Sequence, residues 1–470
     1  IVLQSTVPST DFIVSVSNAP AVTWTNAPSG GTILNGNGVS IAQLLTHTAA
    51  FPTTVTYAIT PRGPLPTSCL GPQITRTVIV NPRGQVNDPA DQVRCAGSAT
   101  AAVTFATNRT GGTTTYAWTN NNTSIGLAAS GNGNIASFTA LNAGTSPVTA
   151  TITVTPSFEG CPGTPQTFTI TVNPAGQVND PADQTRCNGT ATAAVTFTTN
   201  RSGGTTTYAW SNSNTSIGLA ASGTGNIASF TATNTGTSPA TATITVTPSF
   251  EGCAGTPETF TITVNPSGQV NDPADQVVCN GAATAAVSFA TNRTGGTTTY
   301  SWTNNTTSIG LAASGSGNIA SFTATNTGTA PVTATITVTP SFEGCAGTPQ
   351  TFTIRVNPSG QVNDPADQVR CNGAATAAVN FTTNRSGGTT TYAWTNSNTS
   401  IGLAASGNGN IASFTATNTG TSPVTATITV TPSFEGCAGT PQTFTITVNP
   451  AGQVNDPADQ TRCNGAATAA

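Results

Sequence analysis

The sequence predicts an all-β protein built as a tandem array of seven-stranded antiparallel β-sandwiches. The first observation is a repeat: the pair Asn-Pro recurs every 92 residues, and long stretches around it are almost identical. The second is an alternation of threonine with Ala, Ile, Val or Phe, as in residues 241–246 and 259–264, which gives a strand one apolar face. The third is that no stretch shows a helical period. A period of 92 residues is large enough for each repeat to fold around its own core.

The repeats set the predicted domain boundaries. We expect a diverged first unit, four regular units and the start of another, at residues 1–82, 83–174, 175–266, 267–358, 359–450 and 451–470. Strands in the first unit are expected at 12–16, 22–24, 55–59 and 77–80, and its opening strand is expected to be missing. The diverged sequence of the first unit is typical of a terminal repeat, because end repeats have a different neighbour.

The first regular unit contains seven predicted strands in the order of the chain. They are expected near residues 92–95, 100–106, 114–119, 125–129, 135–140, 148–155 and 167–172. Glycine and asparagine clusters separate them, and Asn173-Pro174 ends the last strand because proline cannot donate to a ladder. Seven short strands in about 90 residues are typical of two packed antiparallel sheets.

One tryptophan recurs on the third strand of each regular unit. We expect these indoles to fill the core between the sheets, with a ligand-stacking platform as the alternative. The four residues are Trp118, Trp210, Trp302 and Trp394.

Composition excludes several classes of function. Charged residues are 6% of the chain, the net charge is −4 and lysine is absent, so we expect no nucleic-acid partner. No apolar run approaches 18 residues, so we expect no membrane insertion in this segment. The single histidine, His47, has no catalytic motif around it, and no serine or threonine has a recognisable base. We therefore expect no enzymatic activity.

Ten cysteines form two series with the 92-residue period, which predicts disulfides and an extracellular location. Three pairings are open. Cys95 with Cys161 lies within a unit and would contribute about 4 kcal/mol. Cys69 with Cys95 crosses a connector, and Cys95 with Cys253 would join neighbouring units. The candidates in the regular units are Cys95, Cys161, Cys187, Cys253, Cys279, Cys345, Cys371 and Cys437.

Carboxylates occur at two places in each unit, the entry connector and the last hairpin turn. If both lie at the same end of a sandwich, their oxygens could bind Ca²⁺ at the junctions, although aspartate also sets turns before proline. The candidates are Asp88, Asp91, Glu159, Asp180, Asp183, Glu251, Asp272, Asp275, Glu343, Asp364, Asp367 and Glu435. No other cofactor is expected.

The motifs resemble a known family. Asn-Pro, then NDPADQ before a cysteine, then Tyr-Ala-Trp and TATITVTP resemble the PKD-like and immunoglobulin-like repeats of giant Bacteroidota cell-surface adhesins, including the flavobacterial gliding adhesin. The resemblance covers residues 83–470 well. It implies immunoglobulin-like sandwiches, type IX secretion, a cell-surface location and a role in adhesion or gliding motility. It also favours the pairing within each unit.

Three functions follow from these expectations. The first is an extended stalk in which near-identical units supply reach, about 200 Å for five units. The second is a carbohydrate-binding array that reads surface glycans through exposed aromatic side chains. The third is self-association into fibres, because the threonine-rich strands lack the lysines that protect sheet edges.

Overall fold

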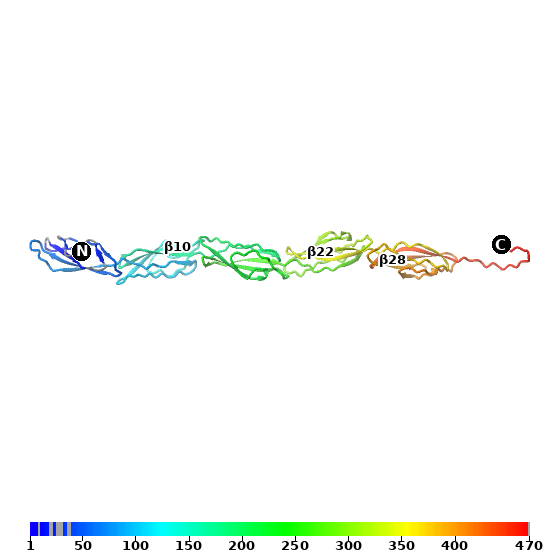
Figure 1. The fold of residues 1–470 in the computed structure, drawn as a ribbon, viewed down its shortest axis with the longest axis horizontal. Coiled ribbons are helices and arrows are strands. Elements are labelled where there is room, and N and C mark those ends of the chain that lie inside the picture. The colour runs from blue at the N-terminus through cyan, green and yellow to red at the C-terminus, as the bar shows by residue number, and fades with distance from the viewer. Residues whose placement is uncertain (8–9, 18–21, 25–31, 35–38, 469–470) are drawn as a thin grey trace.

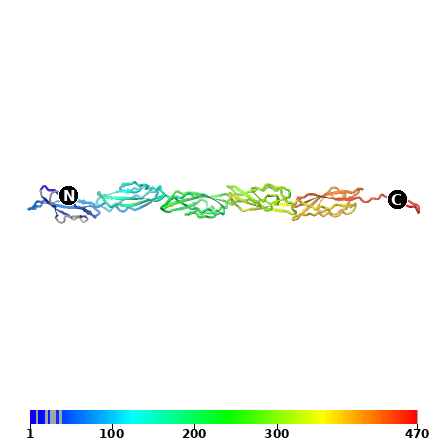
Figure 2. The same ribbon diagram turned by 90° about the horizontal axis from the view of Figure 1, so that it is seen from above.

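The computed structural model describes residues 1–7, 10–17, 22–24, 32–34 and 39–468. Figure 1 shows the units in single file along one axis, and the view turned by 90° in Figure 2 shows the same straight rod. We number the units 1 to 5 by the boundaries predicted above. Each unit has a separate hydrophobic cluster, so the cores do not merge along the rod. The predicted class, an all-β tandem array, is confirmed.

Unit 2 shows the regular architecture. Its elements are β7 (Gln92–Cys95), β8 (Thr114–Asn120), the 3₁₀ turn η1 (Thr123–Ile125), β9 (Ser130–Asn132), β10 (Val148–Phe158), β11 (Cys161–Pro162) and β12 (Gln166–Asn173). The main sheet has the order β7-β12-β10-β8-β9, and β11 pairs with β10. Val154 lies opposite Trp118 of β8, and Val148 lies opposite Val172 of β12. The threonines between these apolar residues therefore face outward.

The second layer is formed by two extended segments joined by isolated bridges, Val103 with Ile135 and Ala99 with Thr139. Ile152, Val154 and Ile170 of the main sheet are fully buried beneath this layer. The alternation in β10 and β12 thus supplies most of the core, because every second side chain points into the same space.

The other regular units repeat these elements. Unit 3 has β13 (Gln184–Cys187), β14 (Thr206–Asn212), η2 (Thr215–Ile217), β15 (Ser222–Thr224), β16 (Ala240–Phe250), β17 (Cys253–Ala254) and β18 (Glu258–Asn265). Unit 4 has β19 (Gln276–Cys279), β20 (Thr298–Asn304), η3 (Thr307–Ile309), β21 (Ser314–Ser316), β22 (Val332–Phe342), β23 (Cys345–Ala346) and β24 (Gln350–Asn357). Unit 5 has β25 (Gln368–Cys371), β26 (Thr390–Asn396), η4 (Thr399–Ile401), β27 (Ser406–Asn408), β28 (Val424–Phe434), β29 (Cys437–Ala438) and β30 (Gln442–Asn449).

Unit 1 is different. Its elements are β1 (Asp11–Val16), β2 (Val22–Trp24), β3 (Thr32–Leu34), β4 (Leu45–His47), β5 (Thr53–Arg62) and β6 (Ile74–Val80). Its main sheet has the order β3-β1-β5-β6, so β6 forms an edge, and β2 pairs with β4 in a second sheet. No described residue pairs with β6 at the place that β7 occupies beside β12.

Three predicted details are wrong. The strand expected at 125–129 is absent, because Asn122 caps a 3₁₀ turn and Gly126, with φ of 94°, ends it at Ile125. The segments at 100–106 and 135–140 form bridges and no continuous strands. The sandwich is also not purely antiparallel, since β7 runs parallel to β12 with Cys95 opposite Asn173. Both strands run from the entry end of the unit to its exit end, and the rest of the unit serves as the crossover.

Candidate functional site: the junctions between units

Disulfides join neighbouring units across three junctions. They pair Cys95 with Cys253, Cys187 with Cys345 and Cys279 with Cys437, each across 158 residues of sequence, with Cα atoms 5.4 to 5.5 Å apart. The first cysteine of each pair ends the first strand of one unit, and the second follows the last hairpin turn of the next unit.

The favoured pairing of Cys95 with Cys161 within a unit is therefore wrong. β7 runs parallel to β12, so Cys95 lies at the exit end of unit 2, opposite Asn173. Cys161 follows the hairpin turn at the entry end, where its carbonyl oxygen accepts the N–H of Gly84 in the connector. The two cysteines lie at opposite ends of the unit, and a disulfide needs Cα atoms within about 7 Å. Cys161 and Cys371 are free, as are Cys69 and Cys463.

A tight hairpin presents the second cysteine of each pair. In unit 3 the strand residues Phe250 and Cys253 lie opposite each other, which leaves Glu251 and Gly252 as a two-residue turn. Their φ angles are 47° and 82°, the pattern of a type I′ hairpin. A positive φ is unfavourable for glutamate. The Glu251 carboxylate offsets this backbone strain by accepting the N–H of Thr205 at 2.6 Å. The cysteine that follows is almost completely buried, with 2% exposure.

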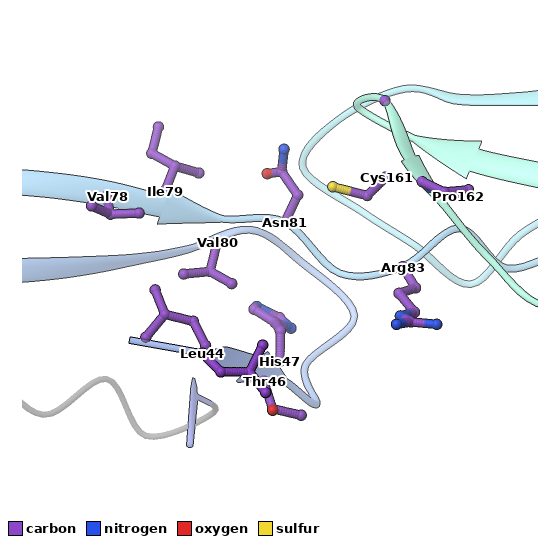
Figure 3. Close-up of a pocket in the computed structure, with 12 residues that line it drawn as sticks. Leu44, Thr46, His47, Val78, Ile79, Val80, Asn81, Arg83, Cys161 and Pro162 are labelled. Atoms are coloured by element: carbon purple, nitrogen blue, oxygen red, sulfur yellow. The ribbon is translucent and has the colours of Figure 1, made fainter. Parts of the chain in front are cut away.

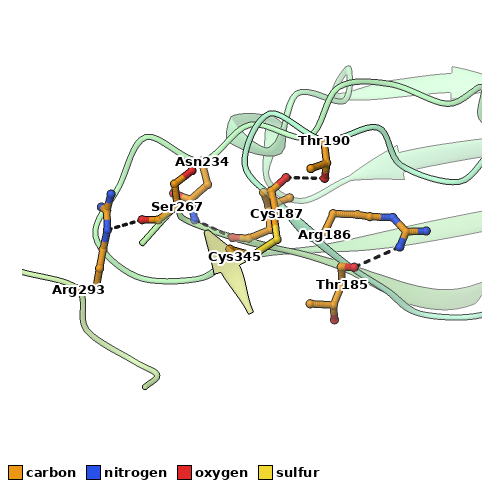
Figure 4. The surroundings of a disulfide bond; sticks show 9 residues. Thr185, Arg186, Cys187, Thr190, Asn234, Ser267, Arg293 and Cys345 are labelled. Carbon is orange, nitrogen blue, oxygen red and sulfur yellow. Dashed lines mark hydrogen bonds between the residues drawn. A yellow bond between two sulfur atoms is a disulfide. The ribbon is translucent and has the colours of Figure 1, made fainter. Parts of the chain in front are cut away.

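An arginine makes a second contact across the junction. The Arg293 guanidinium donates from Nη1 to the Gly236 carbonyl oxygen of the preceding unit at 2.7 Å, and from Nε to the Ser267 carbonyl oxygen of the connector at 2.9 Å. The adjacent backbone adds a hydrogen bond from Thr294 N–H to the Thr237 oxygen. Figure 4 shows Arg293 beside Ser267, with the disulfide of Cys187 and Cys345 nearby. Arg385 makes the same two contacts one period later.

Asparagines fix the loops around the disulfide. Asn234 donates to the carbonyl oxygens of Val264 and Ser238, and its backbone N–H donates to the Asn188 side chain. Asn188 follows Cys187 directly and donates its own N–H to the Asn265 carbonyl oxygen. Each junction of this kind is thus held by a covalent connector, a disulfide and a set of hydrogen bonds, so bending is resisted at several points.

The junction between units 1 and 2 lacks the disulfide. Arg109 still donates to the Arg83 carbonyl oxygen at 2.9 Å, and Thr110 N–H donates to the Ala50 oxygen. A hollow of about 800 Å³ lies where the other junctions hold the bonded cysteine. Figure 3 shows the Cys161 sulfur pointing into this space toward the end of β6.

The connector aspartates next to the first strands accept backbone hydrogen bonds from the last strands. The Asp91 carboxylate accepts the N–H of Thr169 at 2.6 Å, and Asp183, Asp275 and Asp367 make the same contact in the later units. These hydrogen bonds hold the pKa values of Asp91, Asp183 and Asp367 below their ordinary value, because they favour the charged form.

The candidate calcium ligands are held in different places. Glu159 accepts the N–H of Thr113 at the hairpin turn, while Asp91 binds Thr169 on the last strand. Asp88, Asp180, Asp272 and Asp364 are exposed on the connectors, and Glu343 and Glu435 repeat the contact of Glu159. Within the described ranges, no group of three or more His, Cys, Asp or Glu side chains is arranged to hold a metal ion. Calcium binding at the junctions stays a prediction.

The repeated tryptophans lie in the hydrophobic clusters. Trp118, Trp210, Trp302 and Trp394 are 7 to 9% exposed. Trp118 covers the backbone of Gly131 on the neighbouring strand, where any Cβ would collide with the indole. The neighbouring Tyr116 is half-buried, and its ring centroid lies 5.3 Å from that of Phe105.

The sequence analysis did not identify the junction arginines. Arg109, Arg201, Arg293 and Arg385 recur with the same period as the cysteines, which is the signal that could have identified them. Arginine is rare in this chain, and a rare charged residue kept in register indicates a specific contact.

These features define the chain as a tandem array of immunoglobulin-like units with disulfide-linked junctions. A family model described as a PKD-like domain matches residues 5–84 and 276–360. A comparison with curated proteins finds no match.

Solved structures with some similarity are also repeat proteins. They include the extracellular cadherin domains 1–5 of protocadherin gamma B2, at 13% identity and a TM-score of 0.24, with 94% of each chain covered. The human desmocollin-1 ectodomain is 8% identical with a TM-score of 0.25, covering 96% of this chain and 94% of that one. Immunoglobulin domains 1–4 of sidekick-1 are 12% identical with a TM-score of 0.23, covering 78% and 100%. Scores this low establish no common architecture for the whole rod.

Proposed function

We propose that this chain is the structural repeat region of a cell-surface adhesin or extracellular filament, a stalk that transmits tension without lengthening. The observation that carries the proposal is the disulfide between the first strand of one unit and the last hairpin of the next, repeated at three junctions. A spacer that only had to keep distance would not need these bonds.

The disulfides create a short covalent path through the rod. From Cys253 the chain runs along β18, through the connector 266–275 and along β19 to Cys279, about 26 residues in all. Both cysteines are bonded to other units, so the path continues through Cys95 on one side and Cys437 on the other. The strands and the connector are extended already, at about 3.3 Å per residue. Tension applied along the rod therefore reaches covalent bonds before it unfolds a core.

We place the rod outside the cell. Disulfides form and persist in oxidising compartments and are rare in the cytosol. No helix in the described ranges is long and apolar enough to cross a bilayer. The resemblance to Bacteroidota adhesins supports type IX secretion and a role in adhesion or gliding motility as the specific form of this proposal. Cell fractionation with an antibody against unit 3 tests the location, and a purely cytoplasmic signal would contradict it.

Electron microscopy tests the rod itself. Negatively stained oxidised protein should appear as straight particles of single-domain width and about 200 Å in length for five units. After reduction, bending should increase at the three formerly bonded junctions, while the junction of units 1 and 2 should be the most flexible point in oxidised protein. Oxidised particles that bend equally at all junctions would contradict the proposal.

A second candidate function is glycan binding. Tyr116 and Tyr392 each lie in a shallow hollow of about 500 Å³ lined by threonine, serine and asparagine residues, at equivalent positions of units 2 and 5. Aromatic faces beside hydroxyl and amide groups suit sugar rings, and repetition would supply multivalency. A glycan array compares the wild type with a variant in which the four repeat tyrosines are changed to serine. Binding lost in the variant supports this function, and equal signals exclude it.

Calcium at the junctions is tested by thermal unfolding with added Ca²⁺ or EDTA. Asp180→Asn in the connector is the matched variant, because the Asp180 side chain is exposed. A melting temperature raised by calcium in the wild type, and raised less in the variant because one of the repeated sites is lost, would support the site.

A further inference from the structure

The outward face of the main sheet carries hydroxyl groups almost throughout. In unit 2 it consists of the alternate residues that point away from the core in 115–119 of β8, 149–157 of β10 and 167–171 of β12, and all of them except Ala117 are threonine or serine. Their side chains are exposed or half-buried. Units 3, 4 and 5 have the same face, with one charged residue among the four units. We call this surface the threonine face.

The strand register arranges these hydroxyl groups in rows. Thr153 at the centre of β10 lies opposite Thr119 on β8 and Thr167 on β12, so three hydroxyls cross the sheet side by side. Neighbours in a row are about 4.8 Å apart, and successive rows along a strand are about 6.6 Å apart. Four copies of one regular surface therefore lie along the rod. The central position is occupied in the later units by Thr245, Thr337 and Thr429.

A hydroxyl face is its own complement. A hydroxyl both donates and accepts hydrogen bonds, so two identical faces can bond to each other, whereas two faces of like charge repel. The structure contains such bonds within a face, because the Oγ1 atoms of Thr149 and Thr171 lie 2.9 Å apart, and units 3 and 5 repeat this pair. Threonine is also β-branched and stiff, so ordering its side chain at an interface costs little entropy.

Unit 4 departs from this pattern at one position. Arg355 takes the place of Thr171 and lies opposite Thr333, so unit 4 has no hydroxyl pair there. A guanidinium on this face would lose water when a second face covers it, and burying a charge without a partner is unfavourable. The chain therefore contains its own comparison between a fully hydroxyl face and a charged one.

Charge and area both allow two rods to meet on these faces. The net charge is only −4 over 470 residues, and a surface this close to neutrality does little to keep copies apart. Three strands about 4.8 Å apart and about 30 Å long give a face of about 400 Å² per unit. A standard interface takes about 800 Å² from each partner, so the faces of two units suffice. Successive faces adjoin along the rod, because the disulfide of Cys187 and Cys345 joins the main sheet of unit 3 to that of unit 4.

We propose that two copies of this chain pair side by side through their threonine faces, with the two main sheets packed about 10 Å apart. Each copy contributes the same surface, so the contact is isologous. Repetition along the rod makes several weak contacts simultaneous, and this multivalency supplies the affinity that one unit lacks. The inference goes beyond the stalk by naming what lies beside it, which is a second stalk.

The test is sedimentation equilibrium of chain 1–470 with the four free cysteines changed to serine, so that disulfides between copies make no contribution. We expect the mass to rise from about 46.8 kDa toward twice that value as the concentration increases. The pairing should change little with salt, because uncharged groups form almost the whole interface.

Three variants locate the interface. Lysines in the central rows should weaken pairing by about 100-fold or more, because each charge would be buried against a second copy; the changes are Thr153→Lys, Thr245→Lys, Thr337→Lys and Thr429→Lys. The matched control adds the same charge on exposed positions of the second layer and should pair like the wild type; its changes are Thr104→Lys, Thr196→Lys, Ser288→Lys and Asn380→Lys. Arg355→Thr should tighten pairing by about 3-fold or more, although it makes the net charge more negative.

Wild-type protein that stays monomeric up to about 1 mM would overturn the inference. Equal weakening by both lysine sets, or looser pairing of Arg355→Thr, would do the same. The arginine variant also keeps the test decisive if the central-row lysines prevent folding. A monomeric wild type whose glycan-array signal is lost in the central-row variant would assign the face to sugars instead. None of these results affects the stalk, which depends on the disulfides within one chain.

Discussion

Mechanical extension gives the sharpest test of the stalk, because the three disulfides are not equivalent under load. Between residues 83 and 450 the shortest covalent path runs from Cys95 to Cys253, along the chain to Cys279, and on through Cys437. It contains about 51 residues and can reach about 180 Å at 3.6 Å per residue. The disulfide of Cys187 with Cys345 is not on this path.

Two matched double variants separate these roles, in a background where the four free cysteines are serine. Cys95→Ser/Cys253→Ser lengthens the shortest path to about 183 residues, because it must then pass through both remaining disulfides, so full extension should increase by about 480 Å. Cys187→Ser/Cys345→Ser also removes one disulfide between neighbouring units, yet the maximum extension should stay at about 180 Å.

The assay is optical-tweezers stretching with handles at the two ends. Unit 1 lies outside the crosslinked region, so it should give one unfolding step of about 250 Å in every variant and serve as an internal control. In reducing buffer the four regular units should add further steps. Equal lengthening in both double variants, or unfolding steps of the regular units in oxidised wild type, would refute the load path.

Three further predictions concern stability. Gly255→Ala should destabilise unit 3 by about 2 kcal/mol or more, because a Cβ there collides with the Gly176 carbonyl; chemical denaturation measures it, and Ala254→Gly on the same hairpin should cost clearly less. Trp210→Ala should cost about 3 to 5 kcal/mol by leaving a cavity in the core, and a cost under 1 kcal/mol would indicate an indole outside it. The lowered pKa of Asp183 means that its ionised form stabilises the fold above the unfolded carboxyl pKa, about 3.9. That contribution disappears as the pH falls through the lower folded pKa. Asp183→Asn should therefore lose less stability than the wild type when the pH is lowered below about 4, as measured by chemical denaturation at each pH.

The sequence by itself determined the elements that depend on local pattern. Alternation in residues 241–246 predicted the strand β16, because a pleated strand places every second side chain on one face. The period of 92 residues predicted the array, and the hairpin glycines predicted the turns. The 3₁₀ turn at Thr123–Ile125 was missed because a single capped turn has no period to detect.

Only the tertiary structure decided which cysteines meet. Periodicity showed that the cysteines form two classes, but it left three pairings open, because distance in the sequence does not fix distance in space. The parallel pairing of β7 with β12 places Cys95 at the exit end of its unit. Because this end faces the next unit, Cys95 bonds to Cys253 of that unit. The load path through Cys253, Cys279 and Cys437 follows from that arrangement.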